Sequence, residues 1–326
     1  MIKIGVLGAG HLGKIHIKLL KEIPAFELVG FHDSDLEIAK KVSENLGVPY
    51  YQNMQELMDA VEAVDIVTPT LSHYDCARQA LKKTKHIFIE KPLANTVEEA
   101  KEMIALVKEA NVKAQVGHVE RFNPAFLALQ DMQINPMFIE AHRLANFNPR
   151  GTDVSVVLDL MIHDIDLVLS MVKSTVRRIH ASGVSVISNS PDIANARIEF
   201  DNGCVANLTA SRISMKVMRK MRIFQRDAYI TFDFAEKKTE VLSFSDANND
   251  EDALTIEVNT GEKFEKKTIK MYQPEVHAVN SIKMELETFA KAIAQDTETP
   301  VTISDGYNAL HVAHLILQKI DKNAIH

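Results

Sequence analysis

The sequence has few of the features that mark exported, metal-binding or membrane proteins. Its two cysteines, Cys76 and Cys204, lie far apart among 326 residues and match no metal-ligand spacing. No window approaches about 18 uninterrupted apolar residues, and residues 2–7 are too few for the apolar part of a signal peptide. These absences predict a cytoplasmic protein with no disulfide framework, no bound metal and no membrane contact.

An excess of positive charge is also missing. Lys and Arg number 37 against 44 Asp and Glu, so the net charge is -7. Such a surface repels a phosphate backbone unless its basic residues cluster, and nucleic acid is therefore not an expected partner. Apolar residues make up 46% and charged residues 25%, the balance of an ordinary globular protein. The length suffices for two domains.

The first 120 residues alternate between short apolar runs and longer segments whose apolar residues recur at helical spacing. Parallel strands need crossover helices, so this alternation predicts an α/β domain with a doubly wound parallel sheet. The expected strands are residues 2–7, 28–31, 64–68, 87–89 and 112–116.

The pattern changes after residue 120. A helix is expected over residues 155–172, and strand-like stretches joined by tight turns follow it. The Asp201-Asn202-Gly203 sequence, between residues 194–200 and 204–211, is typical of a hairpin. These features predict a mostly antiparallel sheet.

Three further segments complete the expected organisation. The acidic, asparagine-rich residues 245–253 are typical of an exposed loop. Amphipathic helices are expected near residues 276–293 and 306–320. We therefore expect a dinucleotide-binding domain over residues 1–119, and a substrate-binding and oligomerisation domain over residues 120–326.

A glycine-rich turn follows the first expected strand and opens a helix. Gly8-Ala9-Gly10-His11-Leu12-Gly13 fits the G-x-G-x-x-G pattern. The first glycine permits a tight turn, the second lets a pyrophosphate approach the backbone, and the third lets helix and strand pack closely. The context predicts a dinucleotide site; the alternative is a glycine-rich turn that binds nothing.

Asp33 ends the second expected strand, 20 residues after Gly13. A carboxylate there can accept hydrogen bonds from the ribose 2'-hydroxyl and repels a 2'-phosphate, so NAD is favoured over NADP. The alternative is a solvated acidic turn that also contains Asp35.

Glu90-Lys91-Pro92 follows the strand that ends at residue 89. Lys91 therefore emerges at the carboxyl edge of the sheet, where ligands of open α/β folds bind, and it can donate hydrogen bonds to a hydroxyl or carbonyl group. Thr68 and Pro69, at another strand end, and Glu90 are expected to line the cofactor groove. Taken alone, Lys91 would more often be a surface lysine.

Asp159 and His163 lie four residues apart on an otherwise apolar helix, so their side chains share a face. An aspartate one turn away can orient an imidazole and hold its tautomer, and a histidine suits general base chemistry at neutral pH. The alternative is a histidine satisfied within the core. Asp164 and Asp166, nearby, are expected on the outward side of the helix or against the first domain.

Together these motifs resemble the glucose-fructose oxidoreductase and inositol dehydrogenase family, Gfo/Idh/MocA. The resemblance rests on the glycine turn with His16, on Glu90-Lys91-Pro92, and on Asp159 with His163, and it spans nearly the whole chain. It implies an N-terminal Rossmann domain, a C-terminal α/β domain with an open, largely antiparallel sheet, and a catalytic set of Lys91, Asp159 and His163 between the domains.

The chemistry implied by the resemblance is oxidation of a secondary alcohol on a sugar ring. His163 would remove the hydroxyl proton while hydride passes to NAD, Asp159 would orient His163, and Lys91 would stabilise the developing oxyanion. The resemblance adds His118, Glu120 and Arg121 as candidates near the nicotinamide or the substrate.

Residues 115–124 and 158–166 look like the family branch that oxidises UDP-N-acetylhexosamines, including UDP-N-acetylglucosamine 3-dehydrogenases. Leu160 stands where many other members carry a glycine, which weakens any transfer from inositol or glucose enzymes. In a basic stretch that begins at Arg212, this residue or a neighbour could contact the diphosphate of a nucleotide sugar, because arginine binds phosphate in a bidentate manner. The alternative is a solvated strand face or a subunit interface.

Two other functions stay open. One is a dehydrogenase of the same fold that acts on a cyclitol, a free aldose, a dihydrodiol or a tetrapyrrole. The other is a non-catalytic NAD-binding regulator, although the intact Lys91, Asp159 and His163 favour an enzyme. An open sheet with an uncovered face favours a homodimer or homotetramer.

Overall fold

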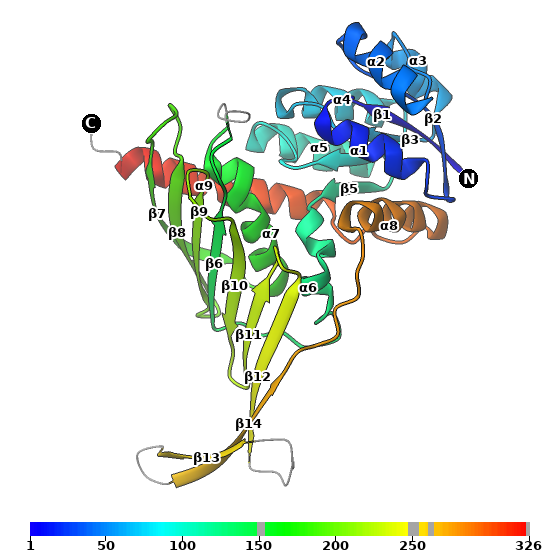
Figure 1. The fold of residues 1–326 in the computed structure, drawn as a ribbon. Coiled ribbons are helices and arrows are strands. Elements are labelled where there is room, and N and C mark those ends of the chain that lie inside the picture. Colours follow the sequence, from blue (N-terminus) through cyan, green and yellow to red (C-terminus); the bar gives the residue numbers. More distant parts are fainter. Residues whose placement is uncertain (149–153, 247–253, 260–263, 324–326) are drawn as a thin grey trace. The chain divides into compact units, whose positions relative to one another are not determined.

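The computed structural model describes residues 1–148, 154–246, 254–259 and 264–323. Contacts between Cα atoms divide the chain into two units (Figure 1). Unit 1 comprises Met1–Phe122 and Asn280–His311, and unit 2 contains the other described residues. The sequence predicts a single domain boundary near residue 120. In the structure, the chain returns to unit 1 after residue 279.

Unit 1 contains a sheet of five parallel strands in the order β2-β1-β3-β4-β5. All of β3 and β5 is buried, as expected for a sheet covered on both faces. The doubly wound parallel sheet predicted from the sequence is confirmed. Its strands are β1 (Ile2–Leu7), β2 (Phe26–His32), β3 (Ala63–Ile66), β4 (His86–Glu90) and β5 (Ala114–Gly117).

Helices connect these strands, and polar side chains begin several of them. The Asp35 side chain accepts hydrogen bonds at the start of α2, and Thr96 forms a capping box with Glu99 at the start of α5. The sequence did not predict the short helix α3. The helices are α1 (His11–Leu20), α2 (Leu36–Leu46), α3 (Met54–Ala60), α4 (Thr70–Lys82) and α5 (Val97–Ala110), followed by the 3-10 helix η1 (Val119–Phe122).

Helices α8 (Ser281–Gln295) and α9 (Ile303–Asn323) come near the end of the chain. In Figure 1, α8 lies beside α1. Its Phe289 ring packs against Phe26 and Phe88, with ring centroids 6.3 and 5.9 Å apart. This contact places an apolar face of α8 on the core of unit 1, and explains why the chain returns there.

Unit 2 contains a nine-stranded sheet in the order β13-β14-β12-β11-β10-β6-β9-β8-β7. Neighbouring strands are antiparallel except β6 and β9, which are parallel, so the prediction of a largely antiparallel sheet is confirmed. The strands are β6 (Phe138–Leu144), β7 (Val176–Val184), β8 (Ile193–Phe200), β9 (Val205–Ser211), β10 (Met218–Phe224), β11 (Ala228–Asp233), β12 (Lys238–Asp246), β13 (Leu254–Asn259) and β14 (Phe264–Tyr272).

One face of this sheet is buried and the other is open. Residues of β8 and β11 alternate between buried and more exposed positions, as expected when one face packs on a core. The short helix α6 (Pro124–Leu127), the π-helical turn η2 (Val157–Met161) and helix α7 (Ile162–Met171) contact the sheet.

Two expectations about loops have different outcomes. The hairpin at Asp201-Asn202-Gly203 joins β8 to β9, and Gly203 has a positive φ of 86°, which glycine adopts without strain. Of the loop expected over residues 245–253, Ser245 and Asp246 instead end β12, and residues 247–253 lie outside the described residues.

Two of the absences noted in the sequence have structural counterparts. Among the described residues, no helix combines the length and the apolar character needed to cross a membrane. Cys76 and Cys204 are buried free thiols.

Candidate active site

The glycine turn between β1 and α1 has the close contacts that its sequence predicts. Gly8 has a positive φ of 95°, and a Cβ atom there would lie 2.6 Å from the Val67 carbonyl oxygen. A Cβ atom at Gly13 would lie 2.1 Å from the Gly8 carbonyl oxygen, so only glycine lets α1 pack this closely. A Cβ atom at Gly10 would meet nothing within 4 Å, which leaves its face of the turn open to a ligand.

The N-terminus of α1 is suited to an anion. Gly10 precedes the helix and provides no side-chain cap, and no acidic residue lies in the first turn. Backbone N–H groups at such a helix start lack partners within the helix, and the helix dipole favours negative charge there. These properties match the pyrophosphate of a dinucleotide.

A cavity of about 690 Å³ lies beside this turn in unit 1. The predicted cofactor residues line it, except Gly13, which lies behind the turn against Gly8. The lining residues among those predicted are Gly8, Gly10, His11, Leu12, Asp33, Thr68, Pro69, Glu90 and Lys91.

Asp33 ties the glycine turn to the end of β2. Its Oδ2 accepts a hydrogen bond of 2.7 Å from the Ala9 backbone N–H, and its Oδ1 accepts one of 2.9 Å from the Asp35 N–H. A carboxylate offers about four acceptor positions, so these two bonds leave capacity for a ribose hydroxyl. The carboxylate is therefore oriented before a cofactor binds.

The loops after β3 and β4 are linked by His73, a residue that the sequence interpretation missed. The two ring nitrogens of His73 lie 2.8 Å from the Pro92 carbonyl oxygen and 2.9 Å from the Thr68 carbonyl oxygen. Burial lowers the pKa of His73, and the two carbonyl oxygens oppose this shift. This contact holds together two walls of the cavity, one of which carries Lys91.

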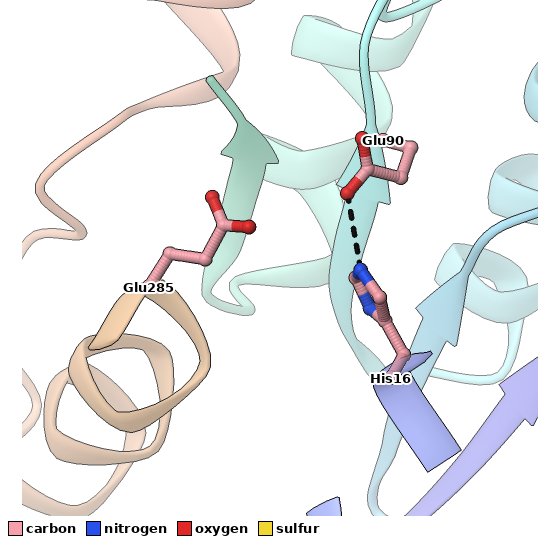
Figure 2. A group of neighbouring side chains, drawn as sticks. All are labelled: His16, Glu90 and Glu285. Atoms are coloured by element: carbon pink, nitrogen blue, oxygen red, sulfur yellow. Dashed lines mark ion pairs between the residues drawn. The ribbon is translucent and has the colours of Figure 1, made fainter. Parts of the chain in front are cut away.

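Behind Glu90 lies a buried group of charged side chains (Figure 2). His16 of α1 lies between two carboxylates, with Nδ1 2.9 Å from Asp65 Oδ2 and Nε2 3.3 Å from Glu90 Oε1. Burial alone would lower the pKa of His16, but Asp65 and Glu90 outweigh it and raise that pKa well above its usual value. His16 thus lies buried between two carboxyl groups that favour its protonated form.

Asp65 and Glu285, which belong to this group, were also missed. Asp65 stands inside the apolar strand β3, and Glu285 stands on the apolar face of α8 with Leu286 and Phe289. A charged residue within an apolar strand or stripe is a detectable signal, because burying a lone charge is costly. That signal does not say which residues meet.

In unit 2, Asp159 and His163 lie on a distorted helix start rather than in one regular helix. Asp159 belongs to the π-helical turn η2, and His163 is the second residue of α7. Both are half-buried. Wide π turns occur frequently at functional sites, and the sequence pattern gives no sign of this one.

Asp164 and Asp166 are not solvated, in contrast to one expectation from the sequence. Both are buried, and Asp164 is 3% exposed. The Arg143 guanidinium donates to both Asp164 oxygens, from Nε over 3.0 Å and from Nη2 over 2.8 Å. This bidentate pair joins α7 to β6 and so holds the helix that carries His163.

The three candidates after β5 lie in unit 1. His118 and Glu120 are buried, and Arg121 is half-buried with its Nη2 4.0 Å from Asp305 Oδ1. None of the three lines the cavity that the described residues form around the glycine turn. A role for them near the nicotinamide or the substrate stays a prediction.

Arg212 is built into the interior of unit 2. It is 5% exposed, and its guanidinium donates to Asp192 Oδ1 over 3.0 Å and to the Val154 carbonyl oxygen over 2.7 Å. Asp192 in turn accepts three backbone N–H bonds, which hold its pKa far below the usual value although burial opposes this. The guanidinium thus serves a structural ion pair, and we do not assign a substrate diphosphate to it.

Lys91 belongs to unit 1, whereas Asp159 and His163 belong to unit 2. The sequence expectation that these three side chains meet at one substrate therefore stays a prediction.

Comparison with known proteins identifies relatives along the chain. Residues 2–118 match the oxidoreductase family with an NAD-binding Rossmann fold, GFO_IDH_MocA, and residues 138–231 match the GFO/IDH/MocA C-terminal domain. The UDP-N-acetylglucosamine 3-dehydrogenase of Acidithiobacillus ferrooxidans is 38% identical over 234 residues, which cover 72% of this chain and 74% of that one. Its solved structure has a TM-score of 0.88 and 30% identity over 98% of both chains. The scyllo-inositol 2-dehydrogenase (NAD(+)) of Bacillus subtilis is 31% identical over 234 residues, 65% of this chain and 68% of that one.

The cofactor is NAD. The glycine turn allows close backbone approach, the start of α1 offers N–H donors, and Asp33 offers an acceptor to a ribose, so the residues present fit the dinucleotide of the family's N-terminal domain. The protein is an oxidoreductase. On the match of both of its domains and on its identity to curated relatives, the chain belongs to the Gfo/Idh/MocA family of NAD-binding oxidoreductases.

Proposed function

We propose that the protein is an NAD-dependent dehydrogenase that oxidises a secondary alcohol on the sugar ring of a UDP-N-acetylhexosamine. The observation that carries this proposal is the similarity to the UDP-N-acetylglucosamine 3-dehydrogenase of Acidithiobacillus ferrooxidans, with 38% identity and a TM-score of 0.88. The inositol dehydrogenase relative is less similar, at 31% identity over a smaller share of the chain. A nucleotide sugar is therefore the first substrate to test.

The proposed general base is His163. Its Nδ1 is buried, so Nε2 is the ring nitrogen that can take the proton of a substrate hydroxyl. We further propose that Asp159, one turn earlier, stabilises the protonated form of the imidazole through its negative charge. The buried pair of Arg143 and Asp164 supports this geometry by holding α7 against the sheet.

Lys91 is the proposed partner from unit 1. It lines the NAD cavity and follows Glu90, whose side chain is held by His16. The bound cofactor supplies the hydride acceptor. The Lys91 ammonium donates a hydrogen bond to the substrate oxygen and stabilises the negative charge that develops there as His163 removes the proton.

A substrate panel tests the proposed specificity. Purified protein with NAD is incubated with UDP-N-acetylglucosamine, other UDP-sugars, free sugars and inositols, and reduction is followed at the nicotinamide absorption band. We expect the highest kcat/KM with a UDP-N-acetylhexosamine. Turnover of an inositol or a free sugar with none of the nucleotide sugars would replace the proposal, and NAD binding without turnover of any compound would favour the regulator.

His163→Ala tests the general base. Proton transfer by a positioned side chain contributes about 100- to 10,000-fold in rate, so we expect kcat to fall by that factor while NADH binding persists. The matched control is His180→Ala, which removes an exposed histidine of β7 in the same unit. Turnover of His163→Ala close to that of the control removes His163 from the role.

A homodimer or homotetramer, and the cytoplasm as the compartment, stay predictions from the sequence. Size-exclusion chromatography with light scattering measures the first directly.

A further inference from the structure

Glu285 is a carboxyl group inside the core of unit 1. It lies on α8 and is 0% exposed, and within the described part of the chain neither of its oxygens has a hydrogen-bond partner. In Figure 2 its side chain points from α8 toward Glu90 of β4 and His16 of α1. One ligating atom from each of these three residues lies within 4.8 Å of the others.

The charges around Glu285 are unbalanced. Asp65 of β3 completes the cluster, which then holds three carboxyl groups and one imidazole. If all four were ionised, three negative charges would face one positive charge in a buried place, and the excess would be costly. The 3-10 helix η1 also packs against α8 and carries the titratable residues Glu120 and Arg121.

His16 forms ion pairs with the other two carboxyl groups, those of Asp65 and Glu90. Its Nδ1 faces Asp65 over 2.9 Å and its Nε2 faces Glu90 over 3.3 Å. Each ring nitrogen thus lies beside a carboxyl group that belongs to a residue other than Glu285. Burial and the nearby Glu90 charge raise the pKa of Glu285 well above its usual value.

We propose that Glu285 is a protonated positioning residue, which shares its carboxyl proton with Glu90 and thereby holds the end of β4 at the wall of the NAD cavity. The O–H of Glu285 donates to a Glu90 oxygen. These two carboxyl groups have oxygens within 4.8 Å of each other, a distance that small side-chain movements shorten to a hydrogen bond. The cluster then carries one uncompensated negative charge instead of two.

Glu90 connects the cluster to the cofactor site. It is 8% exposed, lines the cavity and directly precedes Lys91. On its other side a Cβ atom at Gly117 would lie 2.7 Å from Glu90 Oε1, so the carboxylate occupies space that only a glycine at position 117 leaves open. A fixed Glu90 fixes the backbone from which Lys91 extends. The inference depends on the NAD site and on no particular substrate.

A bound cation is the competing explanation, since His16, Glu90 and Glu285 could supply three ligands. A metal ligand must be a neutral imidazole with a lone pair, however, whereas the two carboxyl groups beside His16 raise its pKa and so favour the protonated ring. A proton therefore explains the cluster better than a metal ion. Metal content distinguishes the two.

Infrared spectroscopy of the full-length protein detects the proton directly. We expect the C=O stretching band of a protonated carboxyl group in the wild type at neutral pH, its loss in Glu285→Gln, and its retention in Glu287→Gln. Glu287 is an exposed residue of the same helix and is the matched control. Absence of the band from the wild type, or its persistence in Glu285→Gln, overturns the proposal.

The pH dependence of unfolding gives a second readout. Above the ordinary glutamate pKa of about 4.3, the folded wild type keeps a proton that the unfolded chain loses. Its folding equilibrium constant therefore falls by up to about tenfold per pH unit relative to Glu285→Gln, until the raised pKa of the folded state is reached. Parallel urea curves of the two proteins from pH 5 to pH 8 would contradict a proton held at Glu285.

NADH titration tests the positioning role. Glu285→Leu removes the donor, and we expect it to weaken NADH binding about tenfold, as for loss of one hydrogen bond to a charged group. Glu285→Gln keeps an N–H donor without charge and should recover most of this loss. Equal weakening by Gln and Leu, or one equivalent of divalent metal in the purified wild type, overturns the proposal. If Glu285→Leu does not fold, the infrared and pH measurements on the wild type and Glu285→Gln still test whether Glu285 is protonated.

These outcomes are separable from the proposed function. Failure of every sugar in the substrate panel leaves the infrared band, the pH dependence and the NADH affinity intact, because none of the three requires a substrate.

Discussion

Asp33 joins two parts of the NAD site through one carboxylate. It accepts the Ala9 N–H of the glycine turn and the Asp35 N–H after β2, and it lines the cavity. Its negative charge is the feature that separates a ribose hydroxyl from a 2'-phosphate, because the carboxylate accepts a hydrogen bond from the first and repels the second.

Asp33→Asn tests this role of the charge. Hydrogen bonds to charged groups contribute roughly 1 kcal/mol more than neutral ones, so we expect the affinity for NAD to fall about tenfold and the preference over NADP to narrow. Fluorescence titration with NADH and NADPH measures both. Asp35→Asn is the matched control, since Asp35 caps α2 and asparagine caps as well. An unchanged ratio of the two affinities would exclude Asp33 from cofactor selection.

The turn at the start of α1 serves both folding and cofactor binding. Two of its glycines have different roles: Gly13 is needed for packing and Gly10 for binding. Gly13 lies against the Gly8 carbonyl, where a Cβ atom would come within 2.1 Å, whereas Gly10 has 4 Å of open space and an ordinary negative φ of -65°. Gly13 is required by packing inside the protein. Gly10 is required only if a ligand such as the cofactor pyrophosphate approaches the backbone there.

Gly13→Ala and Gly10→Ala should therefore differ in kind. We expect Gly13→Ala to lower the free energy of unfolding by about 1–3 kcal/mol or more, because α1 must move away from β1. Gly10→Ala should change it by no more than about 0.5 kcal/mol, as for an open surface position, yet weaken NADH binding. Urea denaturation and NADH titration of both variants measure this. Equal NADH affinity of Gly10→Ala and wild type would contradict the assignment of the pyrophosphate to this turn.

The π-helical turn η2 is the second element that carries chemistry. It widens the helix at Asp159, just before His163. A regular α-helix was expected there, and the structure has a π-helical turn that continues into an α-helix. Helical periodicity in a sequence does not distinguish α from π turns, because one inserted residue hardly changes an apolar pattern of this length.

At the scale of the whole molecule, residues 280–311 complete the unit that residues 1–122 begin. The Phe289 ring packs on Phe26 and Phe88, the Val116 N–H donates to the Val301 carbonyl over 3.1 Å, and Thr299 Oγ1 donates to the Ala114 carbonyl over 2.8 Å. The NAD-binding unit thus includes residues 280–311, which the chain reaches only after the first segment of unit 2.

Phe289→Ala measures this dependence. Phe289 is 0% exposed, and truncation of a buried phenylalanine costs about 3–5 kcal/mol, so we expect a loss of that size in the free energy of unfolding. NADH binding should protect the variant against unfolding. Lys291→Ala, on the exposed side of α8, serves as the control and should change stability little. A loss below about 1 kcal/mol would mean that α8 contributes little to unit 1.

Local patterns in the chain were sufficient for the five parallel strands of unit 1, for the glycine turn, and for Asp33 and Lys91 near strand ends. Each of these depends on neighbours within a few residues, namely periodicity, turn residues and strand boundaries. The same patterns left Asp164 either solvated or against the first domain, and Arg212 or a neighbour as a contact of a substrate diphosphate. In the structure both side chains are buried and form ion pairs.

The meeting of His16, Asp65, Glu90 and Glu285 could not be read from the chain, nor could the return of α8 to the first unit. Each of those four residues stands in an ordinary apolar segment, and its partners come from other strands and helices. Which buried charges face each other depends on how distant segments pack, and that packing is settled by the burial of apolar surface over the entire core rather than by any short stretch.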